Sequence, residues 1–163
     1  MLSEKLTQEL CDQVRFEYYS AYLYLGLSAQ LDRMSYYGMS SWLRLQATEE
    51  VTHGSKIFDY LLRRDKPVEL GPIDQPPMNF ASPLKAFEAA LAHEQKVSVR
   101  IDKLAQQAEA DHDYMTGSFL EWFLDEQVEE ERTVRQIVDR LKLAGDSVQS
   151  LFMIDADLAK RNA

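Results

Sequence analysis

The distribution of proline constrains the fold of this chain more than any other feature of its sequence. All five prolines lie between Pro67 and Pro83 of a chain of 163 residues. Proline breaks a helix interior because it has no backbone N–H and its ring collides with the preceding turn. Long helices can therefore form on both sides of a single proline-containing link.

Apolar residues recur with helical spacing on both sides of this link. Ser82 is a suitable N-cap and Pro83 a suitable first helical residue, so together they mark the start of the first helix after the link. Four long helices and a short fifth one are predicted, over residues 3–33, 39–64, 83–110, 114–143 and 147–158.

The link determines how the helices are connected. It has roughly 17 residues and, at about 3.3 Å per residue, spans about 55 Å, whereas a 28-residue helix is about 42 Å long. The short turns elsewhere produce antiparallel neighbours, and the long link can return along the whole bundle. The sequence therefore predicts one domain over residues 1–163, an all-α four-helix bundle with one long crossover and a short C-terminal helix.

Composition excludes several classes of partner. The net charge of −9 argues against nucleic acid, which requires a basic surface. No apolar run approaches the ~20 residues that span a bilayer, and the N-terminal residues do not resemble a signal peptide, so we expect a cytoplasmic protein without a membrane partner. Acidic surfaces attract cations, but they also simply keep proteins soluble. The positions of the acids must decide between these two explanations.

Each long predicted helix carries one carboxylate on its apolar stripe, at a comparable depth. His53 follows Glu50 by three residues and so shares its face. In the predicted bundle these groups converge, and close carboxylates repel unless protons or divalent cations neutralise them. Oxygen ligands with a single imidazole suit iron or manganese better than structural zinc. The sequence therefore predicts a dinuclear metal site formed by Glu17, Glu50, His53, Glu94 and Glu130.

A second acidic group adjoins the first. Three of its members lie at i, i+3 and i+4 on one helix, and the fourth precedes Glu50. We expect a third, more exposed cation site formed by Glu49, Glu126, Glu129 and Glu130. For Glu129 and Glu131 a solvated helix face is an equal alternative, because runs of charge usually face water.

Three segments together resemble the bacterial non-haem ferritin family, and the resemblance covers essentially the whole chain. They are Glu17-Tyr18-Tyr19-Ser20-Ala21-Tyr22, Glu50-Val51-Thr52-His53 and Glu126-Gln127-Val128-Glu129-Glu130-Glu131. The resemblance implies a ferroxidase centre in which Glu17, Glu50 and His53 hold one iron, while Glu50 bridges to a second iron held by Glu94 and Glu130. It also places Gln127 and Tyr24 beside the centre and makes the second acidic group the third site of the family.

The resemblance further implies iron as the metal and no haem. Bacterioferritin-like sequences offer an axial methionine directly after the glutamate, where this chain has Val51. Many other di-iron proteins carry a second Glu-x-x-His, but here Thr133 follows Glu130 at that spacing. A centre with one histidine suits iron that moves on to a mineral.

The resemblance therefore implies iron storage and detoxification. It implies that Fe(II) is oxidised by dioxygen or peroxide and that a ferric oxo-hydroxide mineral is deposited inside a hollow shell of 24 identical subunits. Leu151, Phe152 and Ile154 would pack near the fourfold axes. A di-iron redox enzyme without storage, a DNA-protecting mini-ferritin and a purely structural bundle are the alternatives. His93 is expected to point off the stripe and His112 to lie in a turn, neither as a ligand.

Overall fold

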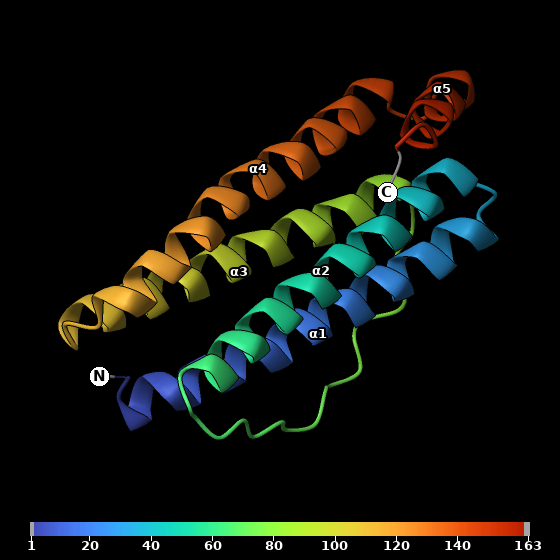
Figure 1. Cartoon of the computed structure of the whole chain (residues 1–163). Helices are drawn as coiled ribbons and strands as arrows, with labels where there is room; N and C mark the ends of the chain where they lie inside the picture. Colours follow the sequence, from blue (N-terminus) through green and yellow to red (C-terminus); the bar gives the residue numbers. More distant parts are fainter. Residues whose placement is uncertain (1, 162–163) are drawn as a thin grey trace.

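The computed structural model describes residues 2–161 and is helical apart from its connections. Met1, Asn162 and Ala163, the ends of the predicted domain, lie outside the described residues. The helices are α1 (Glu4–Arg33), α2 (Tyr37–Arg63), α3 (Pro83–Ala110), α4 (Tyr114–Ala144) and α5 (Val148–Leu158). The prediction of a four-helix bundle with a short fifth helix is confirmed (Figure 1).

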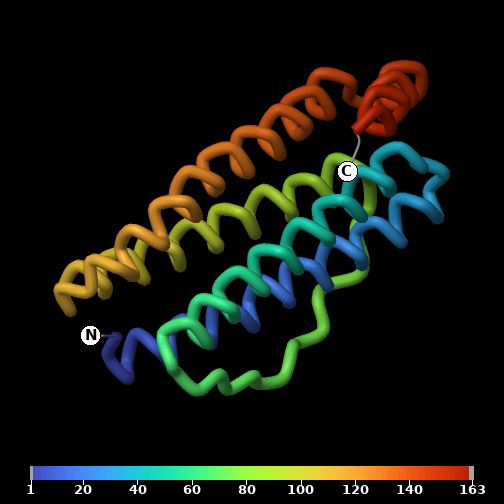
Figure 2. The backbone as a smooth tube through the Cα atoms, in the orientation of Figure 1, coloured from blue at the N-terminus to red at the C-terminus, as the bar shows by residue number. Residues whose placement is uncertain are grey.

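Two antiparallel hairpins form the bundle. Helix α1 packs along α2, α3 packs along α4, and α1 joins the hairpins by packing against α3. The link of residues 64–82 runs along the outside of the α1–α2 hairpin from one end of the bundle to the other (Figure 2). Helix α5 packs against α2 and α4 at the end where α2 begins. The long crossover is therefore present as predicted.

Local capping explains where three of the long helices begin. The side chains of Ser3, Ser82 and Asp113 each accept a hydrogen bond from the backbone N–H three residues later. Such caps satisfy donors that the first helical turn leaves free. Helices α3 and α4 consequently begin at the predicted residues, and α1 begins one residue after its predicted start.

Helix α2 is an exception, because it begins at Tyr37, two residues before the predicted start. The N-cap residue Tyr36 makes no side-chain capping bond. Instead, Asp155 of α5 accepts a hydrogen bond from the Met39 N–H at 2.7 Å. Gly38 permits this contact, since a Cβ at this position would lie 1.9 Å from the Asp155 carbonyl oxygen. A cap supplied by a distant helix extends α2.

The hydrophobic core consists of two separate clusters. One surrounds Tyr24, Leu43 and Phe87 at the α5 end, and the other surrounds Leu10 and Ile101 at the opposite end. On every long helix the buried carboxylate lies in the interval between the two clusters. Because charge interrupts each apolar stripe, none of the helices described is long and apolar enough to cross a membrane.

Helix α5 buries one side against the bundle. Ile154 and Leu158 are buried, and Leu151 is half-buried. Phe152 is 49% exposed and lies against Tyr36 with ring centroids 5.7 Å apart. The buried residues of α5 are Ile154, Asp155 and Leu158, and packing of Leu151, Phe152 and Ile154 near fourfold axes stays a prediction.

Candidate metal centre

The predicted dinuclear site lies in the polar layer between the two hydrophobic clusters. Its five side chains are all buried: Glu17, Glu50, His53, Glu94 and Glu130. Glu17, Glu50 and His53 each offer one ligand atom, and these atoms lie within 4.8 Å of one another. His53 Nδ1 is 3.6 Å from Glu50 Oε2. Small shifts of these side chains would bring all three ligand atoms onto one metal ion.

Neutral donors orient the two carboxylates expected to hold the second ion. Glu94 accepts a hydrogen bond from the Tyr24 hydroxyl and another, at 3.2 Å, from the Gln127 amide. Glu130 accepts one from the Gln46 amide. A neutral donor fixes a carboxylate without cancelling its charge, so both groups keep their capacity to bind a cation.

One carboxylate oxygen at the centre lacks a partner. Glu17 Oε1 accepts a hydrogen bond from Gln13 Nε2 at 2.8 Å, whereas Oε2 is buried and has no partner among the described residues. Leaving a buried carboxylate oxygen unpaired is costly, and buried charges are normally paired or bound to metal. Because Glu17 adjoins Glu50 and His53, a metal ion at this position would satisfy the orphaned oxygen.

Burial shifts the protonation of the centre. Desolvation raises the pKa of Glu17 to about 7 and, with repulsion from neighbouring carboxylates, that of Glu130 to about 8. The pKa values of Glu50 and Glu94 are raised for the same main reason. Burial lowers the pKa of His53 to about 4. His53 is thus a neutral ligand at physiological pH, and cations that bind here must displace protons from the carboxyls.

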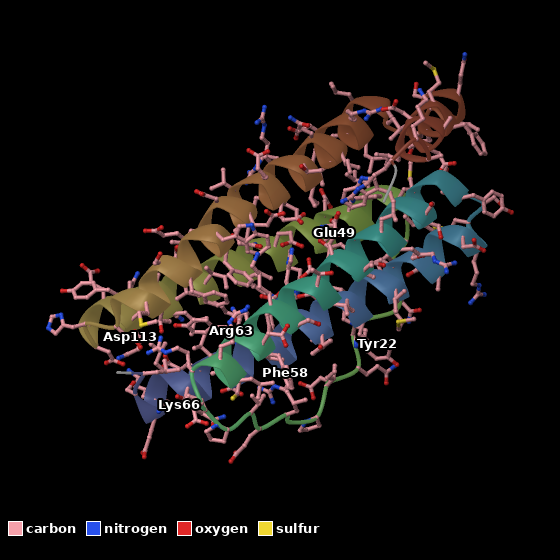
Figure 3. The ribbon with its side chains drawn as sticks, viewed as in Figure 1. Tyr22, Glu49, Phe58, Arg63, Lys66 and Asp113 are labelled. Carbon is pink, nitrogen blue, oxygen red and sulfur yellow. The ribbon has the colours of Figure 1, made fainter. Side chains whose placement is uncertain are left out.

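The second acidic group is only partly assembled. Ligand atoms of Glu126, Glu130 and His53 lie within 4.8 Å of one another. Glu129 has a side chain that is 65% exposed and pairs with Arg132 at 3.7 Å. The Glu49 carboxylate, at mid-length on α2 (Figure 3), pairs with Arg161 at 2.5 Å. The structure therefore brings His53 to this group and holds two of its expected members in ion pairs.

Two glutamines of the centre were not predicted from the sequence. Gln13 and Gln46 are fully buried, and they contact Glu17 and Glu130. Each glutamine precedes a buried glutamate by four residues, one helical turn. For Gln13 this spacing was a usable signal, because a buried carboxylate needs donors on the same face. Gln46 instead donates to Glu130 on α4, a contact that its spacing from Glu50 does not indicate.

His93 lies off the stripe that carries Glu94, as expected, and it is nevertheless buried. Its side chain is only 5% exposed. Its Nε2 lies 2.7 Å from Ser20 Oγ, and its ring stacks on Phe16 with centroids 5.1 Å apart. The contact between α1 and α3 buries this second face of α3. His93 therefore packs the two hairpins together.

A four-helix bundle with a long crossover and a buried layer of carboxylates is the architecture of the ferritin-like proteins. Residues 7–144 match the model of the ferritin-like domain. The bacterial non-heme ferritin of Staphylococcus haemolyticus is 42% identical over 162 residues, which cover 99% of this chain and 98% of the relative. That of Staphylococcus aureus is 38% identical over 161 residues, or 99% and 97% of the two chains. The chain belongs to the ferritin family.

Solved structures agree with this assignment. The open pore ferritin of the hyperthermophilic archaeon Archaeoglobus fulgidus is 39% identical and superimposes with a TM-score of 0.98, covering 99% of this chain and 98% of that chain. A closed form of that ferritin, engineered by site-directed mutagenesis, has a TM-score of 0.97 and 39% identity, covering 99% of each chain. Family membership and the carboxylate–histidine cluster together confirm the prediction of an iron-storing ferroxidase.

Proposed function

We propose that the chain oxidises Fe(II) at the buried layer of carboxylates and stores the ferric product inside a shell of identical subunits. Glu17 and His53 would hold one iron ion, and Glu94 and Glu130 would hold the other. Glu50 would bind both ions. The observation that carries the assignment is the Glu17 carboxylate, which lies beside Glu50 and neutral His53 between two hydrophobic clusters and has one buried oxygen without a partner among the described residues. Iron is the substrate here and leaves the centre as product.

The chemistry follows from the charge of the centre. Two Fe(II) ions displace the protons that burial keeps on the carboxyls, and the resulting carboxylates compensate the cationic charge. Each ion gives one electron, so dioxygen takes up an electron pair and two protons to reach the level of hydrogen peroxide. Paired oxidation avoids a one-electron step to superoxide, and peroxide can serve as the oxidant for further ions. The ferric product then hydrolyses to an oxo-hydroxide mineral.

Tyr24 and Gln127 would position Glu94 during this reaction. The raised pKa of Tyr24, caused mainly by burial and then by nearby carboxylates, keeps the phenol protonated as a donor. Gln127 also approaches the Glu94 backbone carbonyl at 3.3 Å, so its amide donors all face α3. Both residues would fix the carboxylate while the iron beside it changes charge.

The second acidic group would serve as a transit position for iron that leaves the dinuclear centre. Glu130 belongs to both groups, and Glu126 lies within reach of it. Glu49 and Glu129 would join after leaving their arginine partners, since both side chains are substantially exposed. An exposed carboxylate pair binds iron less firmly than the buried centre, which favours onward movement.

Storage requires an enclosure that one bundle cannot provide. We propose a homo-oligomer of 24 subunits in the cytoplasm, without nucleic acid or membrane partners. The relatives are ferritins, and one neighbour is described as an open pore form. Large apolar side chains such as Tyr22, Leu25 and Leu62 are about half exposed in the single chain, as expected for a surface covered by other subunits.

Aerobic Fe(II) titration of the metal-free protein tests the proposed function. We expect rapid oxidation, followed by hundreds of ferric ions that elute with a large particle. Glu130→Ala should abolish the fast phase, because it removes a ligand shared by both groups. Glu121→Ala, at an exposed position on α4, is the matched control and should oxidise iron like the wild type. Binding that stops at two or three ions on a small oligomer would instead indicate a di-iron redox enzyme.

A further inference from the structure

The C-terminal end of the described chain reaches the edge of the metal centre. Arg161 follows α5, and its guanidinium donates to Gln46 Oε1 at 2.7 Å and to Glu49 Oε2 at 2.5 Å. The same guanidinium lies over the Trp42 ring, 4.6 Å from its centroid. Three residues of α2 therefore hold one arginine, whose side chain is only 24% exposed.

The contact with Gln46 extends to the centre itself. An amide side chain has one acceptor oxygen and one donor nitrogen. Arg161 occupies the oxygen, so the nitrogen faces Glu130 and donates to it. Arg161 thereby sets the orientation of Gln46 and, through it, the position of Glu130.

The contact with Glu49 has the opposite effect on metal binding. A carboxylate paired with a guanidinium must leave its partner before it can bind a cation. Arg161 thus helps to position Glu130 of the dinuclear centre, and it keeps Glu49 from binding a cation at the transit position.

We propose that Arg161 is a positioning residue that keeps the transit position weak relative to the dinuclear centre. The inference rests on the proposed function, in which Glu49 completes the transit position. Iron that enters this position must displace the guanidinium from Glu49, and the restored ion pair favours its departure. Arg161 therefore lowers the affinity of the transit position for iron and shortens the time that an ion stays there.

Calorimetric titration of the metal-free protein with Zn²⁺ measures the two positions without any redox step. In Arg161→Gln we expect two tightly bound ions per chain, as in the wild type, with a somewhat lower affinity because Gln46 loses the contact that orients it toward Glu130. The next ion should bind up to about fivefold more tightly, the upper end of the range expected for release of a partly exposed ion pair. Lys160→Gln removes the same charge one residue earlier, where the side chain pairs with Asp157, and should match the wild type.

A double variant separates action through Glu49 from a general change of charge or fold. Arg161→Gln should give no gain in a Glu49→Gln background, and Arg161→Lys should restore most of the wild-type affinity because it keeps a cation beside Glu49. Unchanged affinity for the next ion in Arg161→Gln, or a gain that persists without Glu49, would overturn the inference. Failure of the dinuclear centre would be recognised separately, as loss of the two tight ions from the wild type.

Discussion

The metal-free protein should lose stability as pH rises, and Glu17→Gln should remove part of that loss. Glu17 is 1% exposed, and burial raises its pKa from 4.5 to about 7. A carboxyl whose pKa is higher in the folded than in the unfolded chain holds its proton more firmly when folded. It therefore stabilises the fold fully below pH 4.5, and this contribution disappears as pH rises through 7.

The magnitude follows from the two pKa values. Between pH 5 and pH 8, a carboxyl that titrates at 4.5 when unfolded and at about 7 when folded costs the native state about 2–3 kcal/mol. Glutamine has nearly the same shape and no charge at either pH. The stability of Glu17→Gln should therefore fall by about 2–3 kcal/mol less than that of the wild type over this interval.

Thermal denaturation of chelator-treated protein at pH 5 and pH 8, followed by circular dichroism, measures the difference. For a chain of this length we expect the melting temperature of the wild type to fall by about 5–10 °C more than that of Glu17→Gln. Glu121→Gln, at an exposed position, should behave like the wild type. Equal pH dependence in the wild type and Glu17→Gln would refute the view that Glu17 is protonated in the metal-free centre.

Three further outcomes are expected. Zn²⁺ binding at pH 6.5 should release at least one proton per chain, because buried carboxyls of the centre are protonated at this pH. Calorimetry in buffers of different ionisation enthalpy measures the release, and a value of zero would contradict the view that these carboxyls bind the metal. Tyr24→Phe removes a donor to Glu94 and should slow stopped-flow Fe(II) oxidation about two- to tenfold, with unchanged Zn²⁺ stoichiometry. Gly38→Ala forces a Cβ against Asp155 and should destabilise the protein by about 2–4 kcal/mol, whereas Gly117→Ala meets no atom within 4 Å and should not destabilise it.

The four long helices could be predicted from the sequence, because the helical spacing of apolar residues shows which side of each helix is buried. Four apolar stripes indicated four helices, and a glutamate that interrupts each stripe marked the level of the centre. The proline-containing link separated the two hairpins, because proline excludes helix wherever it occurs inside a segment. These signals are local, so each could be read without knowing the partner helix.

Contacts between distant segments could not be predicted in this way. Asp155 of α5 caps α2, and Arg161 forms an ion pair with Glu49. In both contacts the two residues are more than 100 positions apart in the sequence. Neither contact leaves a periodic signal, since each depends on where a short helix docks at the end of the bundle. His93 is buried for a similar reason, because α3 contacts both α4 and α1. Local sequence patterns show which face of a helix a residue lies on. They do not show which other helices pack against that helix, because this depends on the topology of the bundle.

The division of the hydrophobic core into two clusters determines where the molecule is mechanically weakest. A bundle with a continuous core frays from its ends, whereas this chain has apolar clusters toward both ends and its unfavourable layer in the middle. Bound iron should therefore link the two hydrophobic clusters, which are otherwise stabilised separately. Backbone amides at mid-length on α1 and α2 would then exchange with solvent more slowly when the centre is filled. The stored iron would in this way stabilise the protein that stores it.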